Sequence, residues 1–347
     1  MTLKGFIRTV FVWSRRGVLL LVILAGVLLA AGWTFQEVTT GRQRRQFPPP
    51  GRMVATGGHR LHVVGYGHGA PTVVLEAPVG GSHLVWVQVA AEVARHSRVV
   101  SYDRAGYAWS DPAASPRSAG AIVEDLRRML RAGGEVGPFV FVGHSFGGLI
   151  VRLYALRHPE EVGGLVLVDP THEAMNERLP SAKAEVETFQ RTVRGFSFGA
   201  RVGALRLLDM PLGEASSEWC PSELRPAARA VGFRTSWVDA IASEISALDA
   251  SLSETAEAAA LGGPLPLGDL AVVILSRARP AEPSEWEEYE VALQLHRDLL
   301  GMSSRSRHQV VEETGHFIQV ERPEVVADAI HEVVEWSRAI DPVNRSE

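Results

Sequence analysis

A serine stands between two glycines near the middle of the chain, where residues 143–147 read Gly-His-Ser-Phe-Gly. The apolar residues 139–142 before it are typical of a buried strand, and residues 149–157 after it have the pattern of a helix. A very tight strand-to-helix turn holds a serine hydroxyl clear of its neighbours and leaves no room for side chains two positions away. The pattern predicts that Ser145 is a nucleophile, and the alternative is an ordinary glycine-rich turn.

The serine requires a base, because a hydroxyl at neutral pH is a weak nucleophile. His316 is the best candidate, since it follows the last predicted strand, residues 308–311, in a glycine-marked loop. The carboxyl edge of a parallel sheet is where such folds bind ligands. A solvated or packed histidine is the alternative. His144 adjoins Ser145 but points elsewhere, so we expect it to support the site or to contact substrate.

Two acids compete for the role of orienting His316. Asp169 follows directly after the apolar residues 165–168, at the carboxyl end of a predicted strand. Glu282 comes later, beyond a proline that follows another strand. A buried carboxylate orients such a base from the ring nitrogen that faces away from the serine. We expect Asp169 to be this acid, with Glu282 as its rival and a simple turn-forming aspartate as the other interpretation.

Short apolar strands and amphipathic helices alternate on both sides of the serine, after a hairpin over residues 53–64. This alternation predicts an α/β fold in which a mostly parallel central sheet carries helices on both faces. The predicted strands are residues 72–76, 98–102, 139–142, 165–168, 271–275 and 308–311. The predicted helices are residues 86–95, 122–131, 149–157, 286–300 and 325–337.

The alternation stops between residues 171 and 268. This segment is helical in pattern, mixes polar with apolar residues and is divided by prolines. We expect residues 171–268 to be a helical cap insertion above the site. The core domain would then consist of residues 52–170 and 269–340.

The amino-terminal region contains residues 17–33, an uninterrupted apolar run without a charge. A transmembrane helix needs about 20 mostly apolar residues, so we predict a membrane anchor over residues 1–35 and a basic, proline-rich linker over residues 36–51. The alternative is a cleaved signal peptide and a secreted protein, although signal peptides have a shorter apolar stretch. Basic residues flank the run on both sides. The group before the run is slightly larger and closer to it than the group after it, which favours a cytoplasmic amino terminus with the catalytic domain facing outward.

The composition excludes several classes of partner. The chain has 347 residues, of which 46% are hydrophobic and 22% charged, enough for one large α/β domain with an insertion or for two small domains. A formal net charge of −5 offers no basic face for nucleic acid. The single cysteine, Cys220, cannot form an internal disulfide and has no metal-ligand pattern around it. We expect neither a metal nor an organic cofactor.

Three motifs resemble those of the α/β-hydrolase fold, in its large esterase-like family. They are Gly-His-Ser-Phe-Gly-Gly at residues 143–148, Tyr-Asp-Arg-Ala-Gly-Tyr-Ala-Trp-Ser-Asp at residues 102–111, and Gly-His-Phe at residues 315–317 with Glu-Arg-Pro-Glu at residues 321–324. The resemblance covers roughly residues 53–337 apart from the insertion. The chain order of nucleophile, acid and histidine is also that of the fold.

The resemblance implies a serine hydrolase that cleaves an ester-like acyl bond of a small substrate through an acyl-enzyme. Ser145, His316 and Asp169 would form the triad. Backbone N–H groups of Phe146 and Val79 would form the oxyanion hole. No cofactor is implied.

Two further landmarks bear on this assignment. Pro78 stands where the family usually has glycine in the oxyanion loop, which is a departure in the shape of the loop. Asp103 and Arg104 match a recurrent turn, for which we expect a structural role.

Other activities stay open. Haloalkane dehalogenases and epoxide hydrolases of the family attack with aspartate at the position of Ser145, so the serine argues against those two classes. Fold and triad do not fix a substrate, which leaves peptidase, thioesterase, lactonase and carbon–carbon bond hydrolase activity as alternatives. A non-catalytic ligand-binding protein on the same fold is the alternative from another class.

Overall fold

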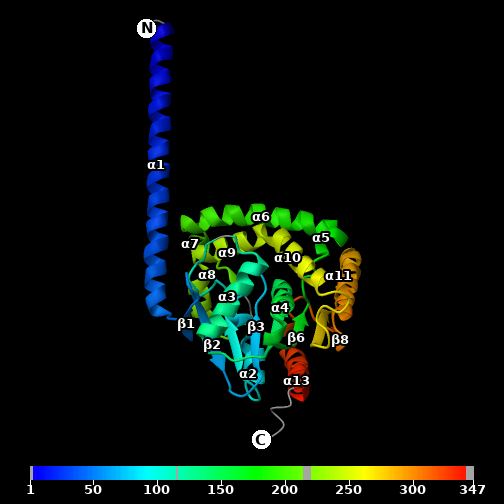
Figure 1. Cartoon of the computed structure of the whole chain (residues 1–347). Coiled ribbons are helices and arrows are strands. Elements are labelled where there is room, and N and C mark those ends of the chain that lie inside the picture. Colours follow the sequence, from blue (N-terminus) through cyan, green and yellow to red (C-terminus); the bar gives the residue numbers. More distant parts are fainter. Residues whose placement is uncertain (1–2, 115, 214–219, 341–347) are drawn as a thin grey trace.

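The computed structural model describes residues 3–114, 116–213 and 220–340. Eight strands form one sheet in the order β1-β2-β4-β3-β5-β6-β7-β8 (Figure 1). The first two strands pair antiparallel, and the other six run parallel to one another. The mostly parallel sheet predicted from the sequence is therefore confirmed. The strands are β1 (Arg52–Ala55), β2 (Arg60–Tyr66), β3 (Thr72–Glu76), β4 (Val99–Tyr102), β5 (Phe139–His144), β6 (Val162–Val168), β7 (Ala271–Arg277) and β8 (Ser306–Val311).

Helices cover both faces of this sheet, as the alternating pattern predicts. One apolar core lies between the sheet and α3 and α4, and a second lies between the sheet and α2 and α13. The sheet positions the site because all its parallel strands end at one edge. The elements of these layers are α2 (Val87–Val93), α3 (Ala119–Ala132), α4 (Phe146–Arg157), α11 (Trp286–Asp298), α12 (Ile318–Glu321) and α13 (Pro323–Ile340), with short 3-10 turns η1 (His83–Trp86), η2 (Pro159–Glu161), η4 (Pro283–Glu285) and η5 (Leu299–Met302).

Local sequence explains these elements. All five residues of β3 are buried, as expected for a strand at the centre of a sheet with helices on both faces. In α3 the side chain of Ser118 accepts a hydrogen bond from the N–H of Ala121 and caps the helix. The buried Ile122, Leu126 and Met129 of α3 recur at helical spacing and face the sheet.

The predicted insertion over residues 171–268 is helical in the part that the structure describes; residues 214–219 lie outside it. Its helices form a third apolar cluster together with residues of the core, namely Leu84 and the turn at residues 107–109. The helix α6 runs across the top of the domain (Figure 1). The last helix differs, because α10 packs against α3 and α4. The helices are α5 (Met175–Arg178), α6 (Pro180–Arg201), α7 (Ala204–Leu207), α8 (Arg225–Gly232), α9 (Thr235–Ser246) and α10 (Leu248–Leu261).

The amino-terminal helix α1 (Leu3–Gln46) projects far beyond the rest of the molecule (Figure 1). Within the described residues it is the one helix long and apolar enough to cross a membrane, by length and composition, with a mean hydropathy of 2.5 over its apolar window. The linker predicted over residues 36–51 is mostly helical instead. The helix continues because the chain has no proline before Pro48. It is also held by Gln36, which is buried and donates a hydrogen bond to the carbonyl of Phe233.

A buried arginine joins β3 to α9. Arg104 is 1% exposed, and its guanidinium donates to Glu76 at 2.6 Å and to both carboxylate oxygens of Glu244 at 2.8 and 2.9 Å. Glu76 ends β3, whereas Glu244 belongs to α9, 140 residues after Arg104. The structural role expected of this arginine thus takes the form of a charged link between core and insertion.

Two tyrosines complete the network. Tyr102 donates to Glu76, and Tyr107 donates to Glu244 at 2.8 Å. Burial raises the pKa of Glu76, although Arg104 and the hydrogen bond from Tyr102 oppose this rise. Burial lowers the pKa of Arg104, but Glu244 and Glu76 more than offset it and hold that pKa well above its usual value. The guanidinium therefore stays charged.

We predict that Arg104→Leu destabilises the protein by about 3–5 kcal/mol, because it leaves buried carboxylates without their cation. Chemical denaturation of the full chain measures the free energy of unfolding. The matched control is Arg95→Leu, which removes an ion pair with Glu92 on the surface. The Arg95 side chain is 64% exposed and that of Glu92 is 40% exposed. That change should alter stability by less than about 1 kcal/mol. Equal stabilities of the two variants would contradict the prediction.

Candidate active site

The turn between β5 and α4 has the strained shape that the sequence predicts. Ser145 has φ 55° and ψ −121°, a conformation that residues other than glycine rarely adopt. A Cβ on Gly143 would lie 2.4 Å from the carbonyl oxygen of Gly147, and one on Gly147 would lie 2.5 Å from that of Glu76. Only glycine therefore fits at either position. The turn packs directly on the end of β3.

A cavity of about 340 Å³ lies at the carboxyl edge of the sheet, and it brings the predicted site residues together. Val79 follows β3, Asp169 follows β6, and His316 follows β8. Ser145 and Phe146 complete the set from the turn after β5. The five residues come from four strand ends, so the parallel sheet is what gathers them.

His316 and Asp169 are directly linked. Oδ2 of Asp169 lies 2.6 Å from Nδ1 of His316, and Oδ1 accepts from the backbone N–H of Arg277 at 3.1 Å. Burial raises the pKa of Asp169. The hydrogen bond and charge of His316 outweigh this effect, and the pKa falls to about 2. Asp169 also has a positive φ of 41°, a second strained residue at this edge.

The rival acid lies elsewhere. Glu282 precedes η4 and is exposed to solvent. Among the described residues, the carboxylate within hydrogen-bond distance of the His316 ring is that of Asp169. The geometry therefore favours Asp169.

His144 supports the histidine loop from behind. Its buried ring accepts a hydrogen bond from the amide of Gln319 at Nδ1, at 2.9 Å, and donates from Nε2 to the carbonyl of His316, at 2.7 Å. Burial, and next the charge of His316, lower the pKa of His144 well below its usual value. The ring therefore stays neutral and fixes the backbone of His316. Its position beside the serine was the only sequence signal for this role.

A second set of polar side chains lies beneath Asp169, and sequence reasoning missed it. Ser276 lies 2.6 Å from Nδ1 of His296 and 2.8 Å from Nε2 of His308, while His296 donates to the carbonyl of Pro170 at 2.9 Å. Burial lowers the pKa of both histidines, that of His308 to about 4. Neutral rings thus hold the loop that carries Asp169. These residues are far apart in sequence, so no motif could have revealed them.

The loop after β3 is fixed in spite of its proline. The carbonyls of Ala77 and Pro78 accept from Arg104 at 2.6 and 2.7 Å, and the N–H of Gly80 donates to the hydroxyl of Tyr107 at 3.2 Å. The N–H of Gly81 turns back to the carbonyl of Pro78 at 3.1 Å. The departure at Pro78 is accommodated because contacts to carbonyl oxygens, which proline keeps, define the loop.

The insertion and α11 supply the apolar wall of the cavity. Its apolar side chains include contributions from α5, α6, α9, α10 and α11. They are Met175, Leu179, Val186, Ile245, Leu248, Ala292 and Leu295. Such a wall suits an apolar part of a ligand. Two acidic residues interrupt it, Glu185 of α6 and Glu288 of α11, whereas the predicted catalytic groups lie at the strand ends.

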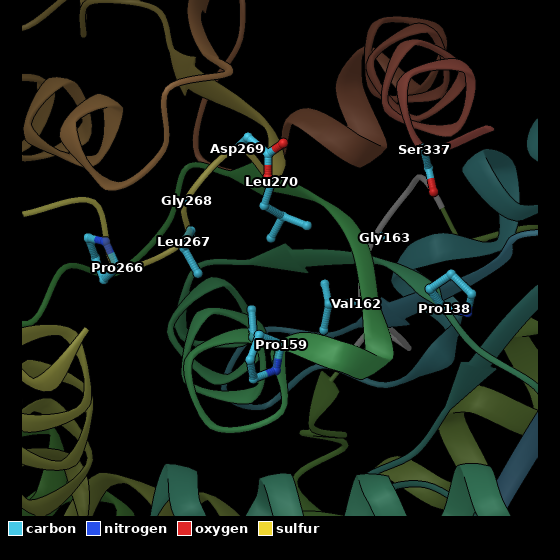
Figure 2. A pocket seen from close by; sticks show the side chains of 11 residues that line it. Pro138, Pro159, Val162, Gly163, Pro266, Leu267, Gly268, Asp269, Leu270 and Ser337 are labelled. Carbon is cyan, nitrogen blue, oxygen red and sulfur yellow. The ribbon is translucent and has the colours of Figure 1, made fainter. Parts of the chain in front are cut away.

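A larger cavity, of about 470 Å³, lies at the opposite edge of the sheet (Figure 2). Pro138 precedes β5, Val162 begins β6, and Leu270 precedes β7, so the amino ends of the strands surround it. Asp269, just before β7, and Ser337 of α13 also line it. None of the predicted site residues lines this cavity.

One buried cluster has the side chains of a metal site. His62, His83 and Asp103 hold their potential ligand atoms within 4.8 Å of one another. However, Asp103 already accepts from Nδ1 of His62 at 2.7 Å, from Nδ1 of His83 at 2.8 Å, and from the backbone N–H of His83 and Trp109. Four donors satisfy the carboxylate, so the cluster serves as a support for the turn after β4.

The comparisons with known proteins agree with this architecture. A family model described as alpha/beta hydrolase fold matches residues 68–258. The chain is 33% identical over 104 residues to the uncharacterised protein YqjL of Bacillus subtilis, which covers 30% of this chain and 41% of that protein. It is 37% identical over 102 residues to RutD of Klebsiella pneumoniae, a candidate carbamate hydrolase, which covers 29% of this chain and 38% of that protein. The chain thus spans about two fifths of each relative's length.

A solved structure extends the likeness to the whole fold. An epoxide hydrolase from Bacillus megaterium superposes with a TM-score of 0.61, covering 82% of this chain and 100% of that chain, at 16% sequence identity. At this identity the likeness concerns the fold alone. Because the family model spans more than half of the chain, the protein belongs to the alpha/beta-hydrolase fold family.

Proposed function

We propose that the protein is a membrane-anchored serine hydrolase that cleaves ester-like acyl bonds. The observation that carries the proposal is the link between Asp169 and His316, 2.6 Å long, in the cavity that Ser145 lines. A strained serine, a histidine and a buried carboxylate in one cavity are the groups that acyl transfer requires.

In the proposed reaction, Ser145 Oγ attacks the acyl carbon and His316 Nε2 takes the hydroxyl proton. Asp169 stabilises the resulting imidazolium through Nδ1 and fixes the ring orientation. His316 then gives the proton to the leaving alcohol, and an acyl-enzyme forms. Water, deprotonated by His316, releases the acid and restores the serine.

The negative charge that develops on the carbonyl oxygen needs N–H donors. We assign this role to the backbone of Phe146 and Val79. Phe146 is the first residue of α4, whose N-terminus lies at the cavity, and Val79 lines the same cavity. The contacts of Arg104 to the neighbouring carbonyls would keep the Val79 loop in place.

The apolar wall favours a substrate with an apolar acyl or alcohol part. We propose that the helices within residues 171–268 act as the cap that selects it. A carbamate is the second candidate, because it has an ester-like carbonyl and because RutD, a relative over part of the chain, is a candidate carbamate hydrolase. A ligand-binding protein without catalysis is the contrasting function, and it would leave the strain at Ser145 without a purpose.

For the anchor, we propose that α1 crosses a membrane once, with the amino terminus in the cytoplasm and the catalytic domain on the other side. The uncharged run and the basic residues before it support this arrangement.

We predict that Ser145→Ala lowers the turnover of a short or medium acyl ester by at least about a thousandfold, because the oxyanion donors cannot replace the nucleophile. The full chain in detergent is assayed with esters of graded length and one carbamate. A fluorophosphonate probe should label the parent chain and not the variant. A parent chain that resists the probe would favour the ligand-binding alternative.

We predict that Asp169→Asn lowers turnover by roughly 10³- to 10⁴-fold, because the amide cannot stabilise the imidazolium. The matched control is Glu282→Gln, an exposed carboxylate near the same edge, which should keep near-normal turnover. Circular dichroism checks that both variants are folded. The opposite pattern, with loss only in the Glu282 variant, would move the acid to the later loop.

We predict that the full chain stays with the membrane pellet after an alkaline carbonate wash, because a hydrophobic span is not held by ionic contacts. The matched variant is Leu21→Arg with Leu24→Arg. Each arginine at the centre of a span costs about 2.5–3.5 kcal/mol, so this variant should appear in the supernatant. Release of the parent chain would exclude an integral anchor.

A further inference from the structure

The contact between α1 and the insertion is close and specific. A Cβ on Gly32 would lie 2.3 Å from the carbonyl oxygen of Val202, so the two backbones touch where α6 leads into α7. Below this point Arg206 of α7 donates to three side chains of α1, at 2.7–3.2 Å. They are Gln36, Thr40 and Gln43. The insertion is therefore fixed to α1 rather than tethered to it.

The length of the apolar run then sets the distance between the domain and a membrane. Residues 17–33 rise by about 25 Å as a helix, which is less than the hydrocarbon thickness of about 30 Å. The contact at Gly32 lies at the end of this run. No length of α1 is left over to separate the insertion from the bilayer.

The surface beside this contact is unusually apolar for a face exposed to water. Phe198 at the end of α6 and Leu207, Leu208 and Met210 in and after α7 are between 44% and 71% exposed. Large apolar side chains grouped on a surface mark an interaction site. The apolar residues of α1 continue this surface, since Leu29 and Trp33 are exposed as well.

The outer face of α6 fits a headgroup layer. Val186 and Val193 face inward. The residues on the opposite face recur three or four positions apart and are all exposed. They are Ala184, Thr188, Arg191, Thr192 and Gly195. Small side chains allow close approach to a membrane surface. The exposed Lys183, Arg191 and Arg194 outnumber the exposed Glu187 among them, and this positive excess attracts anionic lipid.

We propose that the outer surface of α6 and α7 lies in the headgroup layer of the membrane that α1 crosses. In Figure 1, α6 runs crosswise to α1 at the level where the free part of α1 begins, as a helix lying on a bilayer would. The inference rests on the proposed anchor. It names an anionic lipid bilayer as the partner of this surface.

The arrangement also narrows the substrate class of the proposed hydrolase. Glu185 and Val186 of α6 line the cavity that contains Ser145, so one helix forms both the membrane contact and the roof of the site. An acyl ester held in the proposed bilayer would then lie only the width of α6 away from the cavity. The substrate class is therefore a membrane-resident ester with an apolar chain.

The test places nitroxide labels on the full chain in nanodiscs of phosphatidylcholine and phosphatidylglycerol. Single cysteines replace Phe198, Leu208, Leu24 and Val136, and the parent chain serves as the labelling blank because Cys220 is buried. Val136 is 76% exposed at the far edge of the sheet and is the matched control in water. Collision with a nickel chelate should be several-fold weaker at 198 and 208 than at 136.

The label at Leu24 separates the two proposals. If it is shielded from nickel while the labels at 198 and 208 are as accessible as the one at 136, the anchor holds and this inference is wrong. If the label at 24 is also accessible, the anchor itself fails and takes the inference with it.

A kinetic measurement tests the substrate class. Phe198→Asp with Leu208→Asp, positions outside the cavity lining, should leave turnover of a water-soluble ester unchanged and lower turnover of an ester embedded in the nanodisc several-fold. Val136→Asp is the control and should change neither. Equal turnover of the embedded ester by the parent and the double variant would overturn delivery from the membrane. If the parent chain does not hydrolyse the soluble ester, the proposed catalysis is wrong. The nitroxide measurements would still test the membrane contact, because they do not depend on catalysis.

Discussion

The structure depends on one buried charge. Arg104 lies where β3, the loop after it and α9 meet, and it reaches all three with a single guanidinium. A buried cation is costly unless it is fully bonded, so each partner of Arg104 is held in a defined place. The loop that carries Val79 and the insertion that walls the cavity cannot move independently. The shape of the cavity therefore depends on how the insertion packs against the core, and not on the loops alone.

Around this link, the site is kept in order by groups that carry no charge. His144, His296 and His308 have lowered pKa values because they are buried, and neutral rings can donate and accept in a fixed direction. They hold the backbone on both sides of the pair formed by Asp169 and His316. Strain at Ser145 and Asp169 persists because such supports determine the positions of both residues.

The position of α1 extends the same close packing to the proposed membrane contact. Gly32 and Arg206 make α1 and the insertion one body, and the apolar run ends at their contact. The proposed bilayer contact follows because the apolar run is no longer than the hydrocarbon layer is thick, so the insertion must lie next to the bilayer. It relates the place where the proposed apolar substrate would reside to the position of the proposed nucleophile.

The sequence by itself determined the elements and the proposed nucleophile. Alternating apolar strands and amphipathic helices are local patterns, and the glycines around Ser145 report a local lack of space. They predicted the sheet, its two helical layers and the tight turn. They also placed His316 and Asp169 at strand ends on one edge, because parallel strands end together.

Only the tertiary structure decided which of these groups meet. The choice between Asp169 and Glu282 depended on a distance across the sheet, and nothing in the residues near either acid encodes that distance. The supports Ser276, His296 and Gln319 carry no motif, because a hydrogen bond between distant segments leaves no local pattern. The same holds for Arg104 with Glu244 and for α1, whose helix continues into the predicted linker because contacts with the insertion stabilise it. Local chemistry specifies what a segment can form, whereas packing specifies what it contacts.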